Sequence, residues 1–157
     1  MKKNIKYLAI VIVLTFSCKP NQNSDKEFIN SFVQNIILED NYDFNSLHEY
    51  ISFDENVKND KKKKETLYEL VSVYGSEIKD RLTKCNKNFE LLSYDETSDR
   101  SLKTKLEYNN YEKVYNLICD EKILTSIILD NNKIISFFPA FAKKQNNTGK
   151  HPYLLNN

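Results

Sequence analysis

The chain has 157 residues, 40% of them hydrophobic and 12% aromatic, and its formal net charge is +1 at pH 7. This length suits a single domain with a core of its own. The near balance of charge lacks the strong basic excess of nucleic-acid-binding proteins, so we expect no nucleic-acid partner.

The first 17 residues have the layout of an export signal. Segment 1–6 is basic, segment 7–16 is apolar apart from Thr15, and Ser17 is a small residue ahead of a cleavage point. The apolar run is shorter than the roughly 20 residues that a membrane-spanning helix needs. We therefore expect residues 1–17 to be removed as a signal peptide.

This order, followed by Cys18, resembles the signal peptide of bacterial lipoproteins. The resemblance implies cleavage between Ser17 and Cys18, lipidation of Cys18, and a domain outside the cytoplasm, held on the outer or inner membrane of the cell envelope. Thr15 and the bulky Phe16 match a looser form of the motif, because the family more often has Leu three places before the cysteine. Ordinary secretion with a different cleavage point, and a buried N-terminal strand or helix, are the alternatives.

Residues 18–24 are expected to form the lipidated tether between membrane and domain, because the segment after Cys18 is polar and lacks an apolar anchor. Two or more acyl chains, as on lipoproteins, anchor a protein stably, whereas one chain binds marginally. The lipid bilayer is therefore the first expected partner, reached through acylated Cys18. Loss of residues 1–17 leaves 20 basic and 22 acidic side chains, so the mature chain stays close to neutral.

The spacing of apolar residues predicts three helices in the first half of the chain. The first covers about 25–39, and Ser24 with Glu27 has the pattern of a capping box at its start. A short second helix is expected over 46–52, after a polar break. The third helix is expected over about 65–83.

The start of the third helix depends on the lysine run 61–64. Four lysines in a first turn oppose the helix dipole, whereas Thr66 with Glu69 offers a later capping box. Gly75, inside the same helix, costs about 1 kcal/mol relative to Ala. We therefore expect Gly75 to mark close packing or a bend.

From Asn88 onward the apolar spacing changes to two, which is typical of strands with one buried face. Polar pairs at 109–110, 120–121 and 131–132 predict two-residue turns, since Asn and Asp tolerate positive φ. Five strands are expected, over residues 89–94, 102–108, 111–119, 123–129 and 134–138.

Helices followed by an antiparallel meander predict an α+β fold, with about three helices packed on a sheet of four to five strands. We expect one domain over 25–139 and a loose tail over 140–157. The element order resembles NTF2-like and cystatin-like domains, and this resemblance implies a curved sheet wrapped on a long helix. A flat two-layer sheet with helices on one side is the alternative.

Two cysteines remain after Cys18. Two separate buried thiols at Cys85 and Cys119 are favoured over a disulfide, because nothing in the sequence places the two residues within the Cα separation that a disulfide needs. The chain has no CxxC pair and no Cys/His cluster, so we expect neither a metal site nor a cofactor.

No Gly-rich phosphate loop, HExxH or GxSxG motif occurs in the sequence, so we assign no catalytic residue. His48 is interpreted as a surface or rim residue, and His151 has less claim to a role. Lys61–Lys64 are interpreted as a solvated loop rather than a site for lipid head groups or an acidic partner. The resemblance to NTF2-like enzymes, which use a carboxylate and a phenol, points to Glu107, Glu112, Tyr94, Tyr108, Tyr111 and Tyr115.

The sequence therefore predicts a membrane-anchored, non-catalytic binding module, whose further partner is an envelope protein or a small apolar ligand. The alternative is an NTF2-like small-molecule binder or enzyme with a pocket between helix and sheet. A deep cavity with a convergent Tyr and Glu or His favours the alternative, and a filled core with an exposed apolar or aromatic patch favours the binding module.

Overall fold

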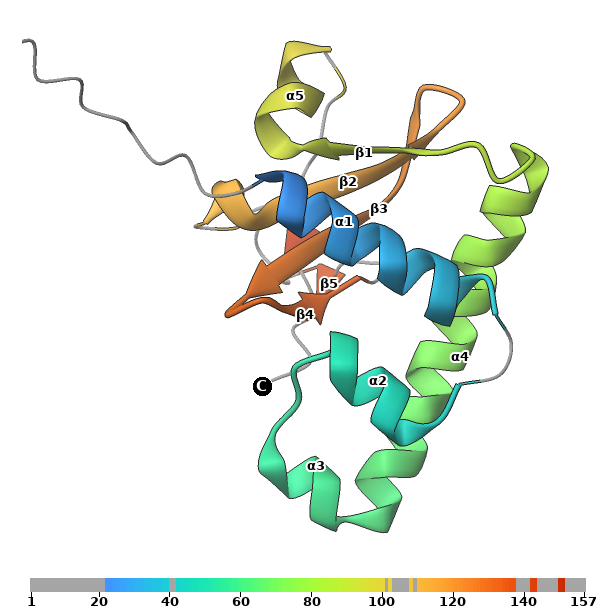
Figure 1. Cartoon of the computed structure of the whole chain (residues 1–157), viewed down its shortest axis with the longest axis vertical. Helices are drawn as coiled ribbons and strands as arrows, with labels where there is room; N and C mark the ends of the chain where they lie inside the picture. Colours follow the sequence, from blue (N-terminus) through green and yellow to red (C-terminus); the bar gives the residue numbers. More distant parts are fainter. Residues whose placement is uncertain are drawn as a thin grey trace, which may run out of the picture.

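The computed structural model describes residues 22–39, 42–100, 102, 108, 110–137, 142–143 and 150–151. It confirms an α+β fold, in which helices pack on an open antiparallel sheet (Figure 1). The helical elements are α1 (Gln22–Phe32), η1 (Val33–Ile37), α2 (Phe44–Tyr50), α3 (Glu55–Asn59), α4 (Lys61–Lys84), α5 (Tyr94–Asp99) and η2 (Tyr111–Lys113). The strands are β1 (Glu90–Ser93), β2 (Val114–Cys119), β3 (Lys122–Asp130), β4 (Lys133–Ser136), β5 (Ala142–Lys143) and β6 (Lys150–His151).

The main sheet has the strand order β1-β2-β3-β4, and each neighbouring pair is antiparallel. Both of its hairpins use the predicted turns. Asp120 and Glu121 join β2 to β3, Asn131 and Asn132 join β3 to β4, and all four have positive φ. A parallel bridge between Ile51 and Ile134 adds the chain after α2 to the β4 edge.

The segment after β1 differs from the prediction. Ser93 caps a short helix, α5, and forms a capping box with Glu96, so Tyr94 begins a helix instead of ending a strand. Most of the predicted strand 102–108, together with Asn109 of the turn after it, lies outside the described residues. Within the described part, β1 pairs directly with β2.

The helix boundaries also differ where side-chain caps decide them. Helix α1 begins at Gln22, so the last three residues of the predicted tether are helical and Ser24 is not its cap. Asp43 caps α2 in a box with Ser46. The Asp60 carboxylate accepts a hydrogen bond from the Lys63 backbone amide, so α4 starts at Lys61. The exposed lysines of this first turn lie toward solvent, where water weakens their unfavourable interaction with the helix dipole.

The core lies between the helices and one face of the sheet. Successive strand residues point to opposite faces, so Tyr115 and Leu117 of β2 face α1 while Asn116 faces α5. Figure 1 shows α1 crossing one face of the sheet. The fully buried side chains of this core include Ile29, Phe32, Val33, Leu47, Leu82, Tyr115, Leu117, Ile134 and Phe137.

A π-turn continues α1 and directs its end toward α4. The Leu38 amide donates to the Val33 carbonyl at 3.0 Å, which is the longer-range bond of a π-helix. Ile37 in this turn approaches α4 at Gly75. Helix α4 is continuous over 24 residues, so Gly75 marks close packing and not a break.

Cys85 and Cys119 form a disulfide, with their Cα atoms 6.3 Å apart, so the prediction of two separate thiols is wrong. The bond joins the residue after α4 to the last residue of β2. The pairing could not be read from the sequence, because the strand register and the exit of α4 bring the two residues together over a separation of 34 positions.

A single domain over 25–139 and a loose tail over 140–157 stay predictions, since most of the tail lies outside the described residues. Within the tail, the two-residue strands β5 and β6 pair antiparallel. The finer likeness to NTF2-like or cystatin-like domains also stays a prediction.

Gly75→Ala is expected to stabilise the protein by about 0.5–1 kcal/mol, because a Cβ removes the entropic cost of glycine within a helix. An added Cβ would lie 3.5 Å from Ile37 Cδ1, which is ordinary van der Waals contact. Urea unfolding of the variant beside the parent measures the change. A loss of stability would mean that α4 and η1 are packed too tightly for one methyl group.

Reduction of the disulfide is expected to lower the free energy of unfolding by about 3–4 kcal/mol, because an open chain gains the entropy of a loop of this length. Urea unfolding with and without dithiothreitol tests it. A Cys85→Ser/Cys119→Ser variant should be as unstable as the reduced protein and insensitive to dithiothreitol. Equal stability before and after reduction would contradict the expectation.

Candidate functional site

The tyrosines and glutamates implied by the NTF2-like resemblance do not gather in one place. Tyr115 faces the helices, whereas Tyr94, Tyr108 and Tyr111 pack on the opposite sheet face around Val114, Ile128 and Ile135. The Tyr94 and Tyr111 rings stack at 4.2 Å. Glu112 is exposed on η2, and Glu107 lies outside the described residues. The described members of this set are therefore divided between two faces.

His48 has a structural setting. Its ring lies edge-on to Phe53, with ring centres 5.1 Å apart. Its backbone carbonyl accepts a hydrogen bond from Lys133 Nζ at 2.8 Å, which ties the end of α2 to β4. His151 lies on β6.

The lysine run is helical and not a loop. Lys61–Lys64 form the first turn of α4. Lys61 lies 3.9 Å from Glu65 in an exposed pair, and Lys64 lies 4.5 Å above the Phe44 ring. Two of the four lysines therefore contact a neighbouring side chain. The lysine run lies at the same end of the molecule as α3 (Figure 1).

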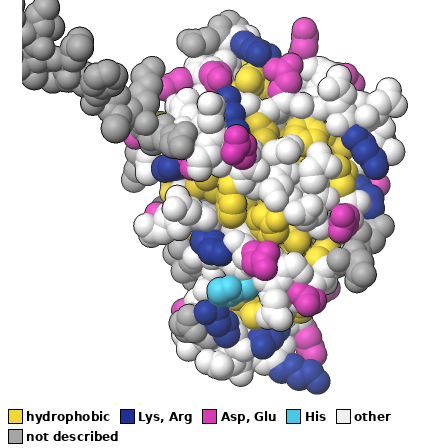
Figure 2. Space-filling view, viewed as in Figure 1, with side chains coloured by type: hydrophobic (Ala, Val, Ile, Leu, Met, Phe, Trp, Pro, Cys, Tyr) yellow, Lys and Arg dark blue, Asp and Glu magenta, His cyan; other side chains and the backbone are white. Residues whose placement is uncertain are grey.

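Hydrophobic side chains show at the surface on both sides of α1 in Figure 2, among scattered charges. At the margin of the core, Phe28, Leu38, Phe89 and Leu91 are half-buried and pack against it. In the described part of the chain, large buried side chains of α1 and the sheet, such as Phe32, Leu117 and Phe137, fill the space between them.

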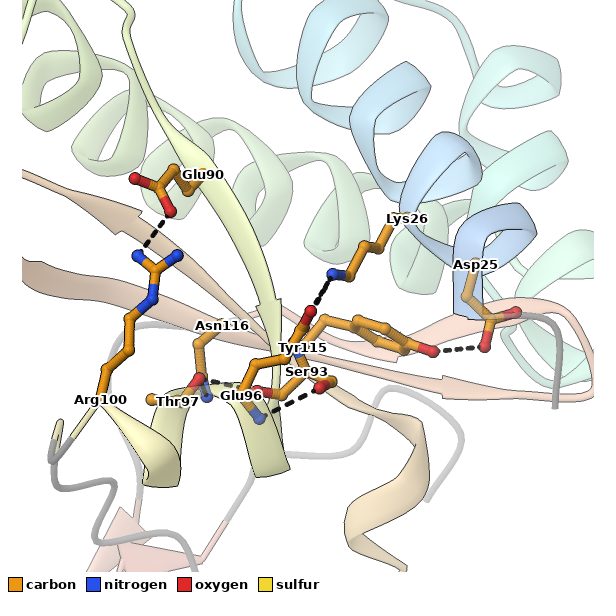
Figure 3. A network of polar contacts seen from close by, with 9 residues as sticks. All are labelled: Asp25, Lys26, Glu90, Ser93, Glu96, Thr97, Arg100, Tyr115 and Asn116. Carbon is orange, nitrogen blue, oxygen red and sulfur yellow. Dashed lines mark hydrogen bonds and ion pairs between the residues drawn. The ribbon is translucent and has the colours of Figure 1, made fainter. Parts of the chain in front are cut away.

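A buried carboxylate fixes the start of α1 to the start of β2 (Figure 3). Asp25 is 7% exposed, and its Oδ2 accepts hydrogen bonds from the Tyr115 hydroxyl at 2.7 Å and from Lys113 Nζ at 2.8 Å. Burial raises the pKa of the Tyr115 phenol well above its usual value, and the bond to Asp25 raises it further. The phenol therefore stays protonated and serves as a donor.

A second ion pair, between Lys26 and Glu96, lies beside the Asp25 contacts and joins α1 to α5 (Figure 3). Lys26 Nζ donates to both carboxylate oxygens of Glu96, at 2.9 and 2.7 Å. Burial raises the pKa of Glu96, but hydrogen bonds from Lys26 and Ser93 outweigh burial and hold it below its usual value. This pair adds stability that is present near neutral pH and is lost as the pH falls through the pKa of Glu96.

A chain of buried hydroxyl and amide groups crosses the opposite face of the sheet. Asn116 Nδ2 donates to the Thr97 hydroxyl at 3.0 Å, and Asn116 Oδ1 accepts from the Ser126 hydroxyl at 2.6 Å. The Thr97 hydroxyl in turn donates to the Ser93 carbonyl. Ser136, on the next strand, has a buried hydroxyl without a hydrogen-bond partner among the described residues. From Thr97 to Ser126, these buried side chains hydrogen-bond to one another, and the hydrogen bonds hold α5 on the sheet.

A pocket of about 430 Å³ lies at the β2–β3 turn in the described part of the chain. Arg100 and Glu90 form one side, with Arg100 Nη1 2.7 Å from Glu90 Oε2 (Figure 3). The acidic turn forms the other side. The full lining is Asn88, Glu90, Arg100, Leu102, Ile118, Cys119, Asp120 and Glu121. Its concave shape and uneven charge make it the candidate binding site.

The described residues contain no group of three or more His, Cys, Asp or Glu placed to hold a metal ion. Among the same residues, no helix is long and apolar enough to cross a membrane. Comparisons with protein-family models, curated proteins and solved structures give no match. The site is therefore assessed by its own geometry.

Among the residues of the buried network and the pocket, the sequence pointed to Tyr115 alone, and only through the NTF2-like resemblance. One local signal was present, because Ser93 and Glu96 have capping-box spacing that predicts α5 and hence the position of Arg100. Asp25 and Tyr115 carried no such signal, since they are 90 positions apart and meet only through the packing of α1 on β2.

Tyr115→Phe is expected to destabilise the protein by about 1–2 kcal/mol, because the buried Asp25 carboxylate loses a donor. In the parent, the unfolded chain releases the phenol proton near pH 10 while the folded protein keeps it. Stability should therefore fall as the pH rises above about 10, by up to about 1.4 kcal/mol per pH unit, and Tyr115→Phe should remove that contribution.

Urea unfolding at pH 8, 10 and 11 measures both effects. Tyr94→Phe is the matched control, because its ring stays stacked on the opposite face of the sheet and its hydroxyl makes no hydrogen bond to another described residue. An alkaline slope that is unchanged in Tyr115→Phe would contradict the assignment.

Proposed function

We propose that the protein is a lipid-anchored domain of the bacterial cell envelope that binds another protein without catalysing a reaction. The observation that carries this proposal is the Cys85–Cys119 disulfide. Disulfides persist in oxidising compartments outside the cytoplasm and are rare within it. The bond therefore supports the export signal independently of residues 1–18.

The start of α1 sharpens the proposed anchoring. Helix α1 begins at Gln22, so three residues separate it from Cys18. An extended chain of this length reaches about 14 Å at most. A domain lipidated at Cys18 would therefore be held close to the bilayer, with the first turn of α1 on the membrane side.

Binding is favoured over catalysis by the arrangement of the side chains. The space between helices and sheet is filled by core residues such as Phe32, Leu117 and Phe137. The tyrosines that would serve an NTF2-like pocket lie on two faces of the sheet. A pocket of mixed charge at the sheet end suits recognition of a partner.

Cys18→Ser is expected to release the protein from the membrane fraction, because the thioether to lipid cannot form. Fractionation of cells that produce each form, followed by mass measurement of the mature N-terminus, tests this. Ser17→Ala keeps a small residue before the cleavage point and should leave anchoring unchanged. Membrane association that persists in Cys18→Ser would overturn the lipoprotein assignment.

A further inference from the structure

We propose that the pocket at the β2–β3 turn binds a basic peptide segment of a protein partner, with a Lys or Arg side chain next to an apolar one. This inference rests on the proposed function, since it names the partner of that binding domain. Three features of the pocket carry it: an apolar floor, two exposed carboxylates with no hydrogen bond or ion pair to any described residue, and a position away from the proposed anchor.

The floor of the pocket is apolar and fixed. Ile118 and Cys119 are only 4% and 6% exposed, and Leu102 is half-buried beside them. Cys119 is bound to Cys85, and Ile118 is opposite Glu90 in the β1–β2 register. A disulfide and a strand pair therefore hold the floor in place, so that an apolar side chain meets a preformed surface.

The charges around this floor are unequal. Arg100 is paired with Glu90, so these two largely cancel each other. Asp120 and Glu121 are exposed, and no hydrogen bond or ion pair of either carboxylate is found among the described residues. The open side of the pocket is therefore acidic, and it attracts an ammonium or guanidinium group.

The β2–β3 turn holds Glu121 in a backbone conformation that is unfavourable for glutamate. Asp120 and Glu121 have φ of 48° and 59°, the left-handed region that non-glycine residues other than Asn and Asp rarely adopt. The equivalent turn at the other end of β3 uses Asn131 and Asn132, which tolerate this conformation. The contrast shows that local turn preference does not explain Glu121.

The pocket lies at the end of the sheet opposite the start of α1. Asp25 of α1 contacts Lys113 and Tyr115, where β2 begins, whereas the pocket follows residue Cys119, where β2 ends. Six residues of strand put roughly 20 Å between these ends. With the anchor just before α1, the pocket opens away from the attachment point and toward a partner.

The test uses the full-length protein in neutral dodecyl maltoside micelles and a fluorescein-labelled peptide, Gly-Lys-Leu-Lys-Gly-Ser. The peptide with both lysines replaced by glutamate is the negative probe. Fluorescence anisotropy should show that the lysine peptide binds, that the glutamate peptide does not, and that added salt weakens binding. Asp120→Asn/Glu121→Gln keeps the turn and should weaken binding about tenfold.

Glu112→Gln/Asp130→Asn is the matched control. It removes two exposed carboxylates from the other end of the same sheet and should leave the affinity unchanged. Equal weakening in both variants would show general charge attraction and overturn the proposal, as would absence of binding by the lysine peptide. Self-association that Asp120→Asn/Glu121→Gln abolishes would assign the pocket to a second copy of the chain instead.

Failure of this test is separate from failure of the proposed anchoring. Binding in micelles does not depend on where the protein sits in the cell, whereas the Cys18→Ser fractionation does not depend on the pocket. If the protein is membrane-bound but does not bind the lysine peptide, the proposed anchoring stands and only the proposed basic-peptide partner is overturned.

Discussion

The fixing of strand β2 at both ends is the constraint on which the rest of the structure depends. At its start, Lys113 and Tyr115 hold the buried carboxylate of Asp25 and thereby α1. At its end, Cys119 is bonded to Cys85 and thereby to α4. One end is held by hydrogen bonds and charge, the other by a covalent bond. The two longest helices thus keep their positions on the sheet, and the core between them is filled by side chains.

The same strand separates two kinds of packing. Its residues are all buried, but alternate ones face different neighbours. Leu117 meets the apolar core under α1, while Asn116 joins the chain of hydroxyl and amide groups under α5. Buried polar groups that are fully paired specify one arrangement, because any shift leaves a donor or acceptor unpaired. The opposite face of the sheet thus fixes the position of α5, and through it that of Arg100.

Sequence reasoning succeeded where the determinants are local. The apolar faces of α1 and α4 and the β2–β3–β4 meander follow from the spacing of apolar residues, and the Asn131–Asn132 turn follows from residues that accept positive φ. It was wrong where one capping side chain sets the boundary of an element, or where residues far apart in sequence make a contact. Asp60 overrides four lysines at the start of α4, and Ser93 turns the end of β1 into a helix. The disulfide and the pocket bring together residues that are far apart in sequence, so no local sequence pattern predicts them.

The early start of α1 has a consequence for how strongly the proposed partner needs to bind. If Cys18 carries the proposed lipid, the three residues before α1 would keep the domain close to the bilayer, and its pocket would move only within a thin layer beside the membrane. A partner confined to the same layer is present at a high effective concentration, which raises the bound fraction without any added contact. Two exposed carboxylates would give the proposed site only a modest affinity in solution. Within that layer, the same modest affinity is enough for a complex that forms and dissociates rapidly.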